Sequence, residues 1–245
     1  MKLCRTIAIA SGKGGVGKTW FAITLAHALA RQTKRVLLFD ADLGLANVDV
    51  QLGLTPAQDL GSIIAGTATV GDVALRHAEG GFDIIAGRSG SGTLATIDST
   101  TLERVLATLR DAAACYDFAL LDLGAGLDRT VRRMSAWADT LLVLATDEPT
   151  SLTDAYAVVK LYAGDRPRGD VRILVNQAAT RQAGERTFAT LQRACLTFLG
   201  RAPTLAGIVR RDDRVRDAIR HQTLLLTRHP ASPAAADVEA IARSL

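Results

Sequence analysis

A glycine-rich segment at residues 12–19 follows the first apolar run of the chain and constrains its fold more than any other feature. The segment Gly12-Lys13-Gly14-Gly15-Val16-Gly17-Lys18-Thr19 fits the pattern Gly-x4-Gly-Lys-Thr, which is that of a phosphate-binding loop between a strand and a helix. Glycines let the backbone curl so that successive N–H groups can hold phosphate oxygens, and the following helix adds the positive end of its dipole. The pattern predicts a nucleotide site, with Lys18 on the β- and γ-phosphates and the Thr19 hydroxyl on Mg²⁺.

Short apolar runs alternate with helical patterns through nearly the whole chain. Strands of this apolar character are covered on both faces, so the alternation predicts an α/β fold with a single doubly wound, mostly parallel, Rossmann-like sheet and helices on both faces. No Pro/Gly/Ser-rich linker divides the chain, and residues 1–245 are expected to form one domain. The expected strands are Thr6–Ala10, Arg35–Asp40, Phe82–Ala86, Phe118–Asp122, Thr140–Ala145, Val171–Asn176 and Ala206–Val209, and the expected helices lie near 18–31, 58–65, 100–114, 128–137, 151–163, 184–198 and 213–220.

The composition excludes several classes of protein. With 245 residues, of which 48% are hydrophobic, the chain can bury a large core, and its net charge of +4 permits an acidic partner without demanding one. Its three cysteines have no metal-ligand spacing, and no apolar run approaches the roughly 20 residues that span a bilayer. The first residues run directly into a strand without the pattern of a signal peptide. We therefore expect a cytoplasmic protein.

Polar residues follow several of the expected strands, at the edge where parallel sheets bind ligands. Asp40 and Asp42 end the second strand, Asp122 ends the fourth, and Asn176 ends the sixth. An acid that closes an apolar strand beside a phosphate loop is suited to hold a Mg²⁺-bound water, which we expect of Asp122. Residues two apart face the same way on an extended chain, so one of Asp40 and Asp42 could orient the attacking water while the other supports the metal or the loop.

The second lysine of the loop, Lys13, is not required by the general pattern, and with it the chain resembles a known family. Lys-Gly-Gly-Val-Gly-Lys-Thr is the deviant Walker A loop of the MinD/ParA ATPases, which are P-loop NTPases of the SIMIBI class. Within that superfamily, residues 40–49, 121–126 and 148–156 look like the FlhG/FleN flagellar-number regulators. The resemblance covers residues 5–245, and the segment 148–156 is its most specific pointer to the subfamily.

The resemblance implies roles for residues beyond the loop. It makes Lys13 a lysine that reaches across an ATP-bound homodimer to the partner's phosphates, and Asp42 the catalytic acid. Residues 207–212 match the family's adenine-proximal loop, and Asn176 would lie on the adenine side. The expected site thus comprises the catalytic Lys13, Lys18 and Asp42, the ATP-binding Gly12, Lys13, Gly14, Gly15, Val16, Gly17, Lys18, Thr19, Trp20, Asn176, Arg210 and Asp212, and the Mg²⁺-associated Thr19, Asp42 and Asp122.

Two residues depart from the family's pattern. Arg210 stands where the family normally has proline, which loosens φ and could change how the base is held. Trp20 stands where a small or polar residue is usual. Either its ring packs beside the loop, or it shields or crowds the α-phosphate side of the site, in which case the chain could be a nucleotide-binding scaffold that no longer hydrolyses ATP.

The function implied by the resemblance is a slow, Mg²⁺-dependent ATPase switch that regulates the number or placement of flagella. Its partners would be a second copy of itself and a flagellar GTPase, a switch component or a transcription regulator, with a location in the cytoplasm or at the periphery of the cell pole or inner membrane. A ParA-like ATPase that binds DNA non-specifically and a MinD-like ATPase that cycles on the membrane are the alternatives.

Three segments bear on those alternatives. The basic stretch from Arg201 to His221 is interspersed with acids, which favours a solvated helix with i,i+4 pairing over a DNA-binding patch. Residues 234–245 contain small side chains, two acids and one arginine, which is typical of an ordinary surface helix and not of a membrane-targeting one. No activator segment is evident before the first strand. Membrane binding is therefore expected to be weak or indirect, and DNA binding is not favoured.

Overall fold

The computed structural model describes residues 4–87 and 98–245. Within them one eight-stranded sheet has the order β3-β4-β2-β5-β1-β6-β7-β8. Every neighbouring pair is parallel except β3 and β4, which are antiparallel at one edge. The strands are β1 (Arg5–Ser11), β2 (Val36–Ala41), β3 (Leu75–His77), β4 (Phe82–Ile85), β5 (Phe118–Ala125), β6 (Thr140–Ala145), β7 (Asp170–Ala178) and β8 (Thr204–Arg210).

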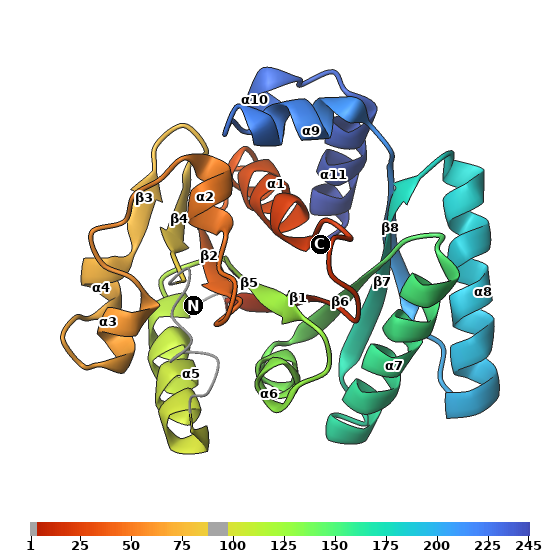
Figure 1. Ribbon diagram of the computed structural model, residues 1–245, viewed down its shortest axis with the longest axis horizontal. Coiled ribbons are helices and arrows are strands. Elements are labelled where there is room, and N and C mark those ends of the chain that lie inside the picture. Colours follow the sequence, from red (N-terminus) through yellow and green to blue (C-terminus); the bar gives the residue numbers. More distant parts are fainter. Residues whose placement is uncertain (1–3, 88–97) are drawn as a thin grey trace.

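Helices cover both faces of this sheet (Figure 1). The helices α1, α2, α9, α10 and α11 contribute to one core cluster, and α3 to α8 contribute to the cluster on the opposite face. The helices are α1 (Lys18–Ala30), α2 (Val48–Leu52), α3 (Leu60–Ile64), α4 (Val70–Val73), α5 (Ser99–Ala113), α6 (Arg129–Trp137), α7 (Pro149–Asp165), α8 (Arg181–Leu199), α9 (Asp213–Arg220), α10 (Leu225–Arg228) and α11 (Pro233–Ser244).

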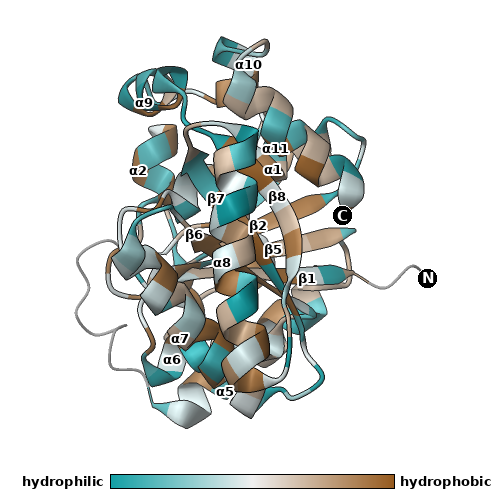
Figure 2. Cartoon of the chain, turned by 90° about the vertical axis from the view of Figure 1, so that its right-hand side faces the viewer, coloured by the Kyte–Doolittle hydropathy of each residue, from teal (hydrophilic) through white to brown (hydrophobic). Residues whose placement is uncertain are grey.

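The strands divide their side chains between the two clusters. In β2, Val36 and Leu38 belong to one cluster, whereas Leu37 and Phe39 belong to the other. A strand that is buried on both faces must be apolar at successive positions, which explains the continuous apolar runs of the sequence. Figure 2 shows mostly brown, apolar strands, whereas the surrounding helices carry both hydrophilic and hydrophobic residues. The predicted doubly wound, mostly parallel sheet is confirmed.

Some elements differ from the sequence-based expectation. The short β3, α2, α4 and α10 were not expected, because three to five residues are too few to show a period. The terminal helix α11 was expected to be an ordinary surface helix. Its inner face packs against α1 and β8 and buries the side chain of Asp237 together with five apolar residues, while residues such as Ala236 and Arg243 are exposed. No helix in the described ranges has both the length and the hydropathy needed to cross a membrane.

Candidate functional site

The glycine-rich loop joins β1 to α1 and has a curled backbone. Gly15 and Gly17 have φ of 77° and 92°, which is the left-handed region that favours glycine. Gly12 packs so closely against α7 that an added Cβ would lie 2.5 Å from the Cβ of Asp154. Because Gly17 is the N-cap of α1, no side chain caps the first N–H groups of this helix. These N–H groups remain available to an anion.

Lys18, at the start of α1, places its ammonium inside the site. Its residue is only 9% exposed, and Nζ donates to Ser11 Oγ at 3.0 Å. Burial lowers the pKa of Lys18, while the charges of Asp122 and Asp42 oppose that change. The structure thus brings this lysine close to two of the predicted site carboxylates.

Asp122 lies at the carboxyl end of β5, opposite Ile9 of β1 and Asp40 of β2. Its residue is 1% exposed, and burial, with the charge of Asp40, raises its pKa to about 7. A hydrogen bond from the Thr19 hydroxyl and the charge of Lys18 oppose the rise. Among the described residues, Oδ1 of Asp122 has no hydrogen-bond partner. A buried carboxylate oxygen without a partner beside a hydroxyl fits a hydrated divalent cation, and Thr19 and Asp122 are the residues that would hold it.

Asp40 and Asp42 have different surroundings, although they are two residues apart. The carboxylate of Asp40 is fully buried and accepts hydrogen bonds from the N–H groups of Asp42, Asn47 and Val48 at 3.2, 2.9 and 3.0 Å. These contacts fix the loop before α2, and burial nevertheless raises the pKa of Asp40 to about 6. Asp40 therefore supports the loop, which is one of the two roles that the sequence allowed.

Asp42 faces an open pocket of about 250 Å³ that Gly124 and Asp128 also line. Its Oδ1 accepts hydrogen bonds from the N–H groups of Gly44 and Leu45 at 3.2 and 2.9 Å. A Cβ added to Gly124 would lie 3.2 Å from this oxygen, so the loop after β5 approaches Asp42 closely. Of the two aspartates at the carboxyl end of β2, Asp42 is the one whose carboxylate remains accessible.

A second pocket, of about 460 Å³, is lined in part by Gly15 and Gly17 of the glycine-rich loop. Asn176 lines it and braces the loop, because its Nδ2 donates to the carbonyl oxygen of Val16 at 2.7 Å. Trp20 also lines it, but Trp20 is 6% exposed and belongs to the core cluster around α1. This burial agrees with a ring that packs beside the loop.

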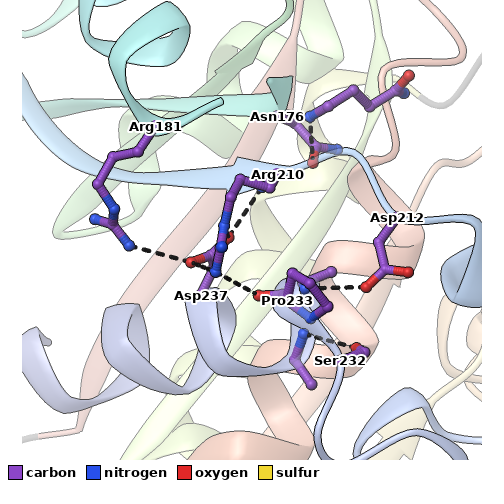
Figure 3. A network of polar contacts seen from close by, with 10 residues as sticks. Asn176, Arg181, Arg210, Asp212, Ser232, Pro233 and Asp237 are labelled. Carbon is purple, nitrogen blue, oxygen red and sulfur yellow. Dashed lines mark hydrogen bonds and ion pairs between the residues drawn. The ribbon is translucent and has the colours of Figure 1, made fainter. Parts of the chain in front are cut away.

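Arg210 and Asp212 line the same pocket, but their charged groups are committed elsewhere (Figure 3). The Arg210 guanidinium binds the Asp237 carboxylate of α11. The carboxylate of Asp212 accepts hydrogen bonds from the N–H groups of Arg214 and Ala234, and thereby caps α9. On α9 itself, Nδ1 of His221 lies 3.3 Å from Oδ1 of Asp217, which is the i,i+4 spacing, and this contact is an ion pair only when the imidazole is protonated.

Lys13 lies apart from Lys18. Its ammonium forms an ion pair with Glu148 and lies 3.2 Å from Thr150 Oγ1, at the beginning of α7. The structure therefore brings together Lys18, Thr19, Asp42 and Asp122, whereas Lys13 is directed towards a helix of its own chain.

Sequence reasoning missed several residues of this region. Ser11 links the loop to Lys18, and Gln177, beside Asn176, has the left-handed φ of 56° that is uncommon for a residue with a side chain. Glu148 was noticed only as part of a family segment, and the contact with Lys13 gave no local signal. The role of Asp237 could not be read from the sequence, because its partners on β8 and α8 lie far away along the chain.

A doubly wound sheet with a phosphate-type loop between β1 and α1 defines a P-loop nucleotide-binding protein. Residues 7–225 match the model of the CobQ/CobB/MinD/ParA nucleotide binding domain, and the chain belongs to this family. The resemblance to the MinD/ParA ATPases, which was inferred from the deviant loop, is thereby confirmed.

Individual relatives agree with the resemblance to flagellar regulators. The chain is 37% identical over 241 residues to antiactivator FleN of Pseudomonas aeruginosa, which covers 98% of this chain and 86% of that protein. It is 30% identical over 185 residues to the flagellum site-determining protein YlxH of Helicobacter pylori, which covers 76% of this chain and 62% of YlxH. The structure of MinD from Pyrococcus horikoshii complexed with Mg-ADP has a TM-score of 0.82 at 22% identity, covering 99% and 96% of the two chains, and shows the shared fold.

Proposed function

We propose that this chain is an ATP-dependent switch ATPase, in which ATP builds a homodimer and hydrolysis dissolves it. The observation that carries the proposal is the convergence of the Lys18 ammonium, the Thr19 hydroxyl and the buried Asp122 carboxylate at the uncapped start of α1. A triphosphate needs a cradle of N–H groups, a lysine and a hydroxyl that can bind the metal, and the start of α1, Lys18 and Thr19 are suited to these roles. The Mg-ADP bound to the MinD relative supports the same cofactor here.

We assign each of the site residues a role in hydrolysis. Lys18 would hold the β- and γ-phosphates, and Thr19 and Asp122 would hold the cation, whose charge would offset that of the phosphates. Asp42 orients the attacking water, because its carboxylate is accessible whereas that of Asp40 is buried and committed to the loop. Catalysis would consist of positioning and charge stabilisation, with slow turnover.

Lys13 gives the switch its dependence on a second chain. In this structure its ammonium is paired with Glu148 and does not lie with Lys18. In the dimer it would bind the phosphates of the ATP held by the second chain. Only the dimer would then have a complete site. This coupling makes the output a binding surface that exists with ATP and disappears after hydrolysis.

The substitution Lys13→Ala tests this proposal. We expect a loss of ATP-dependent dimerisation, measured by light scattering after size exclusion, and an ATPase rate reduced at least about tenfold. Lys160→Ala is the matched control, because Lys160 is an exposed lysine on α7 outside the site. Unchanged dimerisation and rate in Lys13→Ala would contradict the role of Lys13.

The biological output that we propose is control of the number or placement of flagella. FleN is named an antiactivator and YlxH a flagellum site-determining protein, and both cover much of this chain. A pull-down from cell extract with ATP, with Lys18→Ala as the control, tests the assignment. Flagellar switch or transcription components that bind only the wild type would support it, and recovery of chromosomal DNA alone would contradict it.

A further inference from the structure

A buried carboxylate on the terminal helix lies outside the proposed catalytic steps. The side chain of Asp237, on α11, is 1% exposed. It accepts hydrogen bonds from the backbone N–H of Arg210 at 3.0 Å and from Nε and Nη2 of the same residue at 2.8 and 2.9 Å. Nη2 of Arg181, on α8, donates to it at 3.1 Å (Figure 3). A buried carboxylate with this many charged donors is strongly held in one place.

These contacts attach α11 to one wall of the larger pocket. Arg210 and Asp212 both line that pocket. Asp237 holds the first of them, and the N–H of Ala234 donates to the Asp212 carboxylate at 3.2 Å. Nη2 of Arg210 also donates to the carbonyl oxygen of Pro233 at 3.3 Å. The first two turns of α11 therefore hold the pocket wall at two residues, one on each side of residue 211.

The same helix is fixed to the helix that begins at the phosphate loop. α11 packs along α1, and Arg31 and Glu239 form an ion pair of 2.8 Å between the chain after α1 and α11. α11 also lies very close to β8, since a Cβ added to Gly207 would be 2.4 Å from Cγ1 of Ile241. Because α11 touches both α1 and the pocket wall, it sets the separation between them.

Arginine at position 210 makes this attachment possible. A proline at this position would fix φ by itself, but it would have no N–H to donate and no charged group. In this chain the backbone N–H and the guanidinium of Arg210 both bind Asp237. An ion pair with a distant helix thus takes the place of a local covalent restraint.

We propose that Asp237 is a positioning residue of the nucleotide pocket: through Arg210 it fixes residues 210–212 at the separation from the phosphate loop that a bound nucleotide requires. This inference rests on the proposed function, because it assumes that the pocket takes the base and ribose of a nucleotide. A wall that is free to move must be ordered when the nucleotide binds, and that ordering lowers affinity.

Two arginines that bind the same carboxylate allow a matched test. Arg210→Ala removes the guanidinium from the pocket wall, whereas Arg181→Ala removes a guanidinium from α8 that does not line the pocket. The dissociation constant of ADP with Mg²⁺ is measured by calorimetry, and amide hydrogen exchange of residues 211–214 is measured without nucleotide. We expect Arg210→Ala to weaken ADP binding roughly tenfold and to speed exchange, and Arg181→Ala to change the dissociation constant less than about twofold.

Each outcome bears on the proposal. Unchanged ADP affinity in Arg210→Ala would overturn it. Equal weakening of ADP binding in Arg210→Ala and Arg181→Ala would also overturn it, since that would reflect only the loss of a partner for Asp237. A wild-type protein that bound no ADP would contradict the proposed function and leave Asp237 no nucleotide to position. The exchange measurement distinguishes the two failures, because it reports whether Arg210 holds the loop even when no nucleotide binds. Thermal unfolding of both variants verifies that they are folded at the temperature of the assay.

Discussion

The ammonium of Lys13 forms an ion pair with Glu148 of the same chain, at the point where α7 begins. Thr150 Oγ1 lies 3.2 Å from the same nitrogen, and the hydrogen bond from Lys13, together with its charge, lowers the pKa of Glu148. In the proposed dimer, Lys13 must bind the phosphates of the second chain, so it has to leave Glu148 first. The ion pair therefore opposes dimerisation.

The substitution Glu148→Gln is expected to favour the ATP-bound dimer. It removes the charge that holds Lys13 while keeping the size of the side chain. Because the Lys13 and Glu148 side chains are 39% and 59% exposed, the gain is small, with a dimer dissociation constant about threefold lower. Sedimentation with ATP and Mg²⁺ measures this constant, and higher salt should reduce the difference between variant and wild type.

Asp147→Asn is the matched control for Glu148→Gln. Asp147 is the neighbouring exposed acid, and its replacement removes the same charge from the same surface. An equal decrease of the dimer dissociation constant in both variants would indicate a general effect of charge. It would contradict a specific ion pair that retains Lys13 in its own chain. A weaker dimer in Glu148→Gln would indicate that Glu148 contributes to the dimer contact itself.

The backbone of the glycine loop leads to a second prediction. Gly17 has φ of 92°, and a Cβ at this position would lie 2.7 Å from Nδ2 of Asn176, the group that braces Val16. We expect Gly17→Ala to lower the free energy of unfolding by about 2 kcal/mol and to weaken nucleotide binding, because both the strained φ and the displaced amide disturb the loop. Urea unfolding and ADP titration measure the two effects.

Gly14→Ala provides the comparison for stability within the same loop. Gly14 does not have a left-handed φ, and a Cβ there would meet no atom within 4 Å. Its unfolding midpoint should remain close to that of the wild type. If the two substitutions shifted the midpoint equally, the contact between Gly17 and Asn176 would not be the cause.

The sheet and the phosphate loop could be predicted because both leave local patterns in the sequence. Strands such as β6 are buried along their whole length and therefore appear as continuous apolar runs. The loop has glycines at positions where its backbone is left-handed, such as Gly15 and Gly17. The edge strand β3 has neither signal, since it has three residues and two of them are exposed.

The contacts of the site could not be predicted in the same way. Asp40 and Asp42 are equivalent by spacing, and only the N–H groups that surround the Asp40 carboxylate distinguish them. The partners of Lys13 and Arg210 come from segments far away along the chain, namely Glu148 and Asp237. Such pairs depend on how β1, α7, β8 and α11 come together, and a single sequence contains no local trace of that arrangement.

A buried histidine in α1 makes the stability of the fold depend on pH. His27 is 5% exposed, and among the described residues its Nδ1 has no hydrogen-bond partner. Burial, together with the charges of Arg31 and His77, lowers the pKa of His27 to about 4, against the opposing charge of Glu79. The imidazole is therefore neutral in the folded protein over most of the range in which an exposed histidine becomes charged.

The free energy of unfolding is expected to fall as the pH decreases from 6.5 to about 4, because the unfolded chain then binds a proton at His27 that the folded protein does not. One pKa unit corresponds to about 1.4 kcal/mol, and allowance for solvent near the ring leaves a loss of about 2 kcal/mol. His27→Gln has no titrating group at position 27. Its free energy of unfolding, measured with urea across this range, should decline less than that of the wild type. Parallel curves for His27→Gln and the wild type would show that other groups cause the acid sensitivity.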